Sequence, residues 1–91
     1  MQTTMTLDQE ALSVVKSGLE MKRKALDLNR HQYKERLAAF ELSHRITSEQ
    51  FTAKFQAGEL GDNSEWFEWE FVLDALRETD RQIKLLDSVK L

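Results

Sequence analysis

Little in this 91-residue chain can stop a helix, because it contains no proline and only three glycines. Proline removes a backbone donor and clashes with the preceding turn, and a glycine in a helix interior costs about 1 kcal/mol relative to alanine. The glycines are Gly18, Gly58 and Gly61, of which the last two stand close together. The sequence therefore predicts an all-α fold in a single domain, residues 1–91, with a bend near residues 58–64.

The first predicted helix covers about residues 6–44 and starts near Thr6, where the sequence TLDQ fits a capping box. Apolar or small side chains then recur at seven-residue intervals in three rows. The rows are Leu12, Leu19, Leu26, Tyr33 and Phe40; Ala11, Gly18, Ala25 and Ala39; and Val14, Met21, Leu28 and Leu42. Together they form an apolar arc that is too wide for one neighbouring helix. We therefore expect this helix to touch at least two partners, one of them closely along the row of small residues.

A short second helix is predicted at about residues 48–57. Thr47 and Gln50 have the spacing of a capping box at its start, and Gly58 can supply the left-handed residue that ends it. A third helix is predicted at about residues 64–89, capped by Asp62 or Ser64. Its apolar residues follow the alternating three- and four-residue spacing of a coiled-coil seam. They are Trp69, Val72, Leu76, Thr79, Ile83 and Leu86.

The two long helices differ in predicted length. At ~1.5 Å per residue the first is about 60 Å long and the third about 40 Å, so an antiparallel hairpin leaves the first turns of the first helix uncovered. Burying one large apolar side chain contributes roughly 1.5–3 kcal/mol, a large share of a small domain's stability. We therefore predict a homodimer or a higher assembly, most simply an intertwined helical bundle. Its expected oligomer interface consists of Leu7, Leu12, Val14, Val15, Leu19 and Leu26.

The sequence offers little of what an enzyme requires. It has no cysteine, only two histidines, no glycine-rich phosphate loop and no nucleophile-elbow motif. Glu41 and His44 have the Glu-x-x-His spacing of half a di-iron site, but Glu41 falls on the predicted polar face and His44 at the end of its helix. The acidic residues from Asp62 to Asp74 lack the spacing of a calcium loop. We therefore expect no catalytic residue, metal or cofactor, and the iron site is the alternative.

Charge is distributed unevenly along the chain. Residues 1–45 carry eight Lys or Arg against six Asp or Glu, whereas residues 46–91 carry five against ten and have a net charge of −5. Such a second half repels phosphate and attracts a basic protein. The basic run from Lys22 to Lys24 is diluted by neighbouring acids, so a charged helix exterior is favoured over a nucleic-acid site. The chain has no cysteine, no apolar segment long enough to span a membrane and no signal-peptide pattern. It is therefore predicted to be cytoplasmic and not to associate with a membrane.

The aromatic residues fall into two predicted groups. One group has the spacing of core or motif residues, and with Gly58 it comprises Tyr33, Phe40, Phe51, Phe55, Trp66 and Trp69. Phe67 and Phe71 differ, because they lie one turn apart, off the seam of the third helix and among acids. Such aromatics either close a dimer or anchor a foreign protein. The expected partner-binding residues are Glu59, Asp62, Glu65, Phe67, Glu68 and Phe71.

Several short motifs resemble a pattern found in small helical proteins of bacteria and archaea. The motifs are Phe40-Glu41, the sequence TSEQF at residues 47–51, Lys54-Phe55, GELGD at residues 58–62 and WFEW at residues 66–69. The likeness covers about residues 33–86, and it departs at His44-Arg45, where the family commonly has Tyr-Gly. Proteins with this pattern are similar to antitoxins, one half of a small two-gene pair. The resemblance implies that the chain neutralises a toxin by binding it.

The resemblance and the charge pattern together favour a non-enzymatic, oligomeric helical protein of the antitoxin type. Its partners would be a second copy of itself and a basic protein toxin, which an acidic aromatic surface suits. One alternative is a structural or adaptor helical bundle without a toxin. A nucleic-acid-binding helical dimer is the least favoured alternative.

Overall fold

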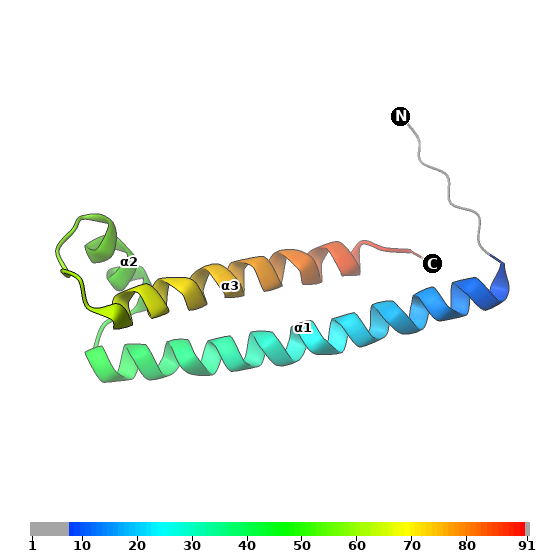
Figure 1. The fold of residues 1–91 in the computed structure, drawn as a ribbon, viewed down its shortest axis with the longest axis horizontal. Helices are drawn as coiled ribbons and strands as arrows, with labels where there is room; N and C mark the ends of the chain where they lie inside the picture. The colour runs from blue at the N-terminus through cyan, green and yellow to red at the C-terminus, as the bar shows by residue number, and fades with distance from the viewer. Residues whose placement is uncertain (1–7, 91) are drawn as a thin grey trace, which may run out of the picture.

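A computed structural model describes residues 8–90, which form three α-helices in the order long, short, long. α1 spans Gln9–His44, α2 spans Ser48–Gln56 and α3 spans Ser64–Asp87. α1 and α3 lie side by side and antiparallel, and α2 covers one end of the pair (Figure 1). The predicted all-α fold, with its long, short and long helices, is therefore confirmed. None of the described helices is long and apolar enough to cross a membrane.

The first helix begins later than the sequence suggested. Asp8 is its N-cap, and the Asp8 carboxylate accepts a hydrogen bond from the backbone N–H of Ala11 at 2.7 Å. A carboxylate is well suited to this position because it meets both the free N–H groups and the positive end of the helix dipole. The N-cap therefore lies two residues after Thr6, the residue at which the sequence placed it. Thr6 and Leu7 themselves lie outside the described residues.

The ends of α2 follow the local sequence closely. The Thr47 hydroxyl accepts from the Gln50 N–H at 3.1 Å, and the Gln50 side-chain oxygen accepts from the Thr47 N–H at 2.9 Å, which completes the predicted capping box. At the other end Gly58 takes a left-handed φ of 74°. Its N–H donates to the Phe55 carbonyl, and the next N–H, of Glu59, donates to the Lys54 carbonyl. This is a Schellman motif, so the predicted role of Gly58 is confirmed.

The N-cap of α3 also differs from the predicted residue. Asn63 is the N-cap, and its side-chain oxygen accepts from the Glu65 N–H at 2.9 Å, so neither Asp62 nor Ser64 has the predicted capping role. Gly61, just before it, again has a φ of 74°. The third helix ends at Asp87 rather than near residue 89.

The hydrophobic core lies where the three helices meet. Its buried members are Leu37, Phe51, Trp69 and Val72, and half-buried residues including Tyr33, Phe40, Phe55 and Trp66 pack around them. Farther along α1, Leu26 is only 4% exposed. Leu26 was expected in an oligomer interface, but its own chain already buries it, so this prediction was wrong.

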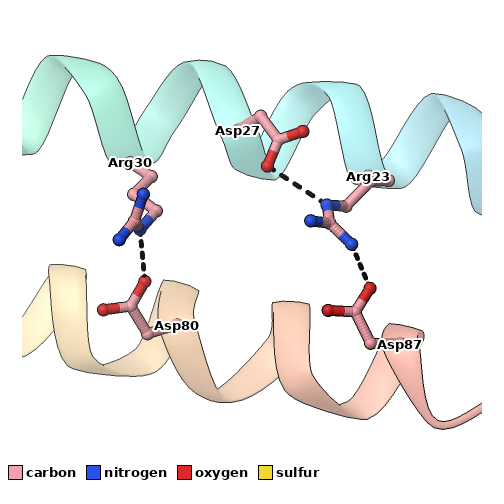
Figure 2. Close-up of polar contacts among 5 residues, drawn as sticks. All are labelled: Arg23, Asp27, Arg30, Asp80 and Asp87. Carbon is pink, nitrogen blue, oxygen red and sulfur yellow. Dashed lines mark hydrogen bonds and ion pairs between the residues drawn. The ribbon is translucent and has the colours of Figure 1, made fainter.

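Two ion pairs mark the register of α1 against α3. Arg30 pairs with Asp80 at 2.7 Å, and Arg23 pairs with Asp87 (Figure 2). Arg23 lies seven residues before Arg30 and Asp87 seven residues after Asp80, as expected for antiparallel helices. Exposed pairs of this kind add little stability, about 0–1 kcal/mol each. They do show that the last residue of α3 reaches only to Arg23. The turns of α1 before Arg23 therefore extend past the end of α3 (Figure 1), as the unequal lengths predicted.

Candidate protein interface

Two phenylalanines form an exposed aromatic surface on α3. Phe67 and Phe71 are 56% and 63% exposed and lie one turn apart. Phe55 of α2 meets Phe67 edge-on, with ring centroids 5.7 Å apart and planes at 87°. We call Phe55, Phe67 and Phe71 the aromatic patch. Large aromatics exposed together on a folded helix are typical of protein-binding surfaces.

The patch sits on a rigid base of stacked rings. Trp69 is completely buried and stacks on Phe51, with centroids 4.2 Å apart and planes at 4°, and on Phe40 at 5.4 Å and 11°. Its indole N–H donates to the hydroxyl of Ser48 at 3.1 Å, so the one polar atom of this side chain is paired. The stack joins all three helices. It therefore fixes the position of the α3 segment that carries Phe67 and Phe71.

The acidic residues predicted to bind a partner do not form one group. Glu65 is half-buried and hydrogen-bonded to the His44 ring at 2.9 Å, so it supports the fold. Glu68 lines a groove between α1 and α3, together with Arg36 and Phe40. Glu59 and Asp62 lie exposed in the loop between α2 and α3. Glu65 lines the same groove, so the structure keeps the two phenylalanines together and divides the acids between this groove and the loop.

The motif GELGD followed by WFEW divides into a structural and a surface part. Gly58 and Gly61 both need a left-handed backbone, and the Trp66 indole N–H holds the loop by donating to the Leu60 carbonyl at 2.9 Å. Leu60 itself packs on the core. These residues, with Trp69, are explained by folding alone. The members that folding leaves at the surface are Glu59, Asp62, Phe67 and Glu68.

Glu41 and His44 both make structural contacts. Glu41 was predicted to face solvent, but it is half-buried because its carboxylate caps α2, accepting from the Ser48 N–H at 2.7 Å. His44 packs against the Trp66 ring with centroids 4.6 Å apart and bonds Glu65. Within residues 8–90, no group of three His, Asp or Glu side chains is placed to hold a metal ion. The capping role of Glu41 was missed because it depends on a contact seven residues away.

The basic residues of α1 are partly neutralised by acids. Arg23 contacts both Asp27 and Asp87, and these hydrogen bonds raise the pKa of its guanidinium (Figure 2). Arg30 is paired with Asp80. A nucleic-acid site needs cations free to meet phosphates. This pairing therefore weakens the nucleic-acid interpretation of the basic run.

The residues predicted for self-association are only partly free. Val14 is 72% exposed, whereas Leu12, Val15 and Leu19 are half-buried. Leu7 lies outside the described residues. Three other residues of α1, from the row to which Val14 belongs, are also exposed: Met21 (71%), Leu28 (56%) and Leu42 (82%). Their seven-residue spacing was visible in the sequence, and it marks a line on α1 that the single chain does not cover.

Comparison of the chain with protein-family models, with curated proteins and with solved structures found no match. The aromatic patch and the exposed row on α1 are therefore interpreted from their own geometry and chemistry.

Proposed function

We propose that this chain is a non-enzymatic protein-binding protein of the antitoxin type, which associates with itself through α1 and binds a basic protein toxin through the aromatic patch. The observation that carries the proposal is the exposure of Phe67 and Phe71 directly beside a tightly packed aromatic core. A small domain has few large aromatics, and burying one contributes roughly 1.5–3 kcal/mol. Two left in solvent on a rigid helix are best explained by a partner that covers them.

Charge supports a basic partner. The patch belongs to residues 46–91, whose net charge is −5. Glu59 follows α2 only four residues after Phe55, so the acidic loop begins beside the patch. Opposite charge speeds encounter and selects partners, while the buried aromatic contact supplies most of the affinity.

The residues with the greatest catalytic or metal-binding potential are used for folding, which supports a non-enzymatic function. Glu41 caps α2, and His44 and Glu65 bond each other beneath the tryptophans. A group held in this way must first give up a contact that supports the fold before it can bind a substrate.

A structural or adaptor bundle is a second candidate, and the exposed row on α1 favours it. Val14, Met21, Leu28 and Leu42 offer a surface for assembly that needs no toxin. In that function the aromatic patch would be dispensable for activity in the cell, whereas the antitoxin function requires it. The two candidates therefore differ in what they predict for the same patch variant.

The test is to express the gene adjacent to this one alone, and then together with this chain, in a bacterial host. The proposal expects growth arrest that the wild-type chain relieves and that the double variant Phe67→Ser, Phe71→Ser does not relieve. Arg77→Ser is the control, because it also removes a large exposed side chain from α3, and it should still relieve arrest. Circular dichroism of each variant checks that the helices are intact.

Each outcome decides between the candidates. An adjacent gene that is harmless when expressed alone removes the antitoxin function and leaves the assembly function. Relief by the well-folded double variant shows that the toxin binds elsewhere than the aromatic patch.

A further inference from the structure

The exposed row on α1 has the spacing of a coiled-coil seam. Three residues before each of its large members stands a small one, which gives alternating steps of three and four residues. The large members are Val14, Met21, Leu28 and Leu42, and the small ones are Ala11, Gly18, Ala25 and Ala39. We call these eight residues, of which only Ala11 is half-buried, the exposed seam. Only between Leu28 and Ala39 is the pattern interrupted by polar residues, Gln32 and Glu35.

Nothing in the packing or backbone of the single chain requires a glycine at position 18. It lies in the middle of α1 and has a negative φ, and a Cβ built on it would meet nothing within 4 Å. Glycine is disfavoured in a helix interior, and alanine would fit here without any clash. A glycine on an otherwise apolar seam permits a second helix to approach closely.

We propose that the exposed seam binds a second copy of this chain in antiparallel orientation, with the twofold axis between Leu19 and Glu20. The inference rests on the proposed self-association and makes it specific. In this register each large side chain faces a small one on the other copy: Val14 faces Ala25, Met21 faces Gly18, and Leu28 faces Ala11. The twofold axis makes every pair occur twice. A continuous apolar contact then runs over residues 11–28.

The two polar positions of the seam distinguish this register from the others. In a parallel dimer Glu35 would face Glu35 and Gly18 would face Gly18, which brings like charges together and leaves a gap. An antiparallel dimer shifted by one heptad toward the C-terminus would pair Gln32 with Val14 and Glu35 with Ala11, and a shift the other way would shorten the apolar contact to residues 11–21. The proposed register leaves both in solvent, because they lie beyond the contact.

The proposed register also brings the second copy to the level at which the hairpin of the first copy ends. Where α3 ends, an apolar groove between α1 and α3 is lined mainly by Leu26, Leu85, Leu86 and Val89. Leu85 and Val89 are exposed in the single chain. In the proposed register this groove lies at the level of residues 11–18 of the second copy, which is the part of α1 that extends past its own α3. The overhanging turns of each chain therefore lie at the same level along the helix axis as the open end of the other.

Cysteine cross-linking tests the orientation directly, because the chain contains no cysteine of its own. Two single variants of the full chain are needed, Val14→Cys and Ala25→Cys, one of them carrying a tag. The proposal expects a disulfide between the two variants when they are mixed under mild oxidation. It expects no disulfide from either variant alone. In this register residue 14, like residue 25, lies 11 positions, or about 16 Å along the helix, from the same residue of the second copy. A disulfide needs a Cα–Cα distance of about 4.4–6.8 Å.

Two further variants serve as controls. Leu42→Cys should not cross-link to itself, although Leu42 is the most exposed large residue of the seam. Gly18→Gln should lower dimer affinity at least tenfold, because the longer side chain would meet Met21 of the second copy. It should not reduce helix content, since glutamine is the better helix former and has free space in the single chain.

Every other result overturns the proposal in a recognisable way. Cross-linking of each variant only with itself shows a parallel dimer, and cross-linking of Val14→Cys to Ala39→Cys shows a shifted register. A dimer by sedimentation that forms no cross-link associates through another face, and in all three cases self-association stands. A monomer at 100 µM by sedimentation would remove the proposed self-association as well, while the growth test of the aromatic patch remains independent.

Discussion

Removing the Trp69 side chain should destabilise the protein more than any other single substitution to alanine. Trp69 is completely buried, stacks on Phe51 and Phe40, and joins α3 to both other helices. Truncation of a buried tryptophan to alanine costs about 3–5 kcal/mol. A chain of this length has a total stability of roughly 5–14 kcal/mol, at about 0.05–0.15 kcal/mol per residue. Trp69→Ala should therefore remove about a fifth or more of the stability, and in the less stable part of that range nearly all of it.

The assay is urea unfolding followed by helix circular dichroism at one fixed protein concentration, since self-association makes stability depend on concentration. With a slope of about 2 kcal/mol per molar urea, a loss of about 4 kcal/mol moves the midpoint by about 2 M. Phe71→Ala is the matched control, because Phe71 is exposed, and it should change stability by less than about 0.5 kcal/mol. A loss below about 1 kcal/mol for Trp69→Ala would refute the interpretation of this ring stack as the centre of the core.

A smaller change separates packing from hydrogen bonding at the same position. Ser48→Ala leaves the Trp69 indole N–H without its partner and should cost about 1–3 kcal/mol. The double variant Trp69→Phe, Ser48→Ala should lose less free energy of unfolding than the two single variants added together, because the hydrogen bond can be lost only once. Additive losses would show that the bond contributes nothing.

Three other substitutions have defined expectations. Arg45 has a left-handed φ of 57°, so Arg45→Gly should stabilise the protein by about 0.5–1 kcal/mol, and a fall in melting temperature would contradict this. Glu41→Ala should cost about 1–2 kcal/mol by removing the carboxylate that caps α2, with Glu41→Gln costing less, whereas equal stability of all three proteins would exclude the cap. Hydrogen bonds from Arg81 and then Gln82 lower the pKa of Glu78 to about 2, so their stabilising effect is present above the ordinary pKa of glutamate and lost as pH falls towards 2. A carbon-13 NMR titration should show this low pKa and its rise in Arg81→Gln, and an unchanged pKa in that variant would show that the pair is not formed.

Helix ends were predictable where only one residue could act as the cap. Thr47 is favoured over its neighbour Ser48 because only Thr47 has a glutamine, Gln50, three residues after it, and the structure uses Thr47 and Gly58 as expected. Three consecutive residues, Asp62, Asn63 and Ser64, can all cap α3, and local sequence does not choose between them. The structure selects Asn63 because the path of the loop through Gly61 decides where the helix can begin.

The face that α1 turns toward α3 was harder to predict, because its apolar arc is wider than one contact. The sequence contained three seven-residue rows and no local signal for which of them α3 covers. Leu26 was therefore predicted to lie in the oligomer interface, although its own chain buries it. Leu37 lies four residues after Tyr33 and three before Phe40, so it shares their face of the helix. It was not predicted as a core residue because it belongs to none of the three seven-residue rows. It is one of the four buried members of the core.

At the aromatic patch the sequence predicted the exposed phenylalanines but not the contacts of the acidic residues near them. Phe67 and Phe71 were singled out because they fall off the seam of α3, and the structure leaves both exposed. One of the acids grouped with them, Glu65, instead bonds His44, a contact that links residues 21 positions apart. Distant pairings of this kind have no signature in periodicity or spacing.

The claim on which the proposals depend most is that α1 offers more apolar surface than its own chain covers, so that a second chain must cover the rest. Sedimentation equilibrium of the full chain at tens of micromolar tests it most directly. We expect twice the chain mass of 10.7 kDa for the wild type and a shift toward the single-chain mass in Gly18→Gln. A wild-type protein that sediments as one chain of 10.7 kDa, folded and with Val14, Met21 and Leu28 exposed, would contradict it.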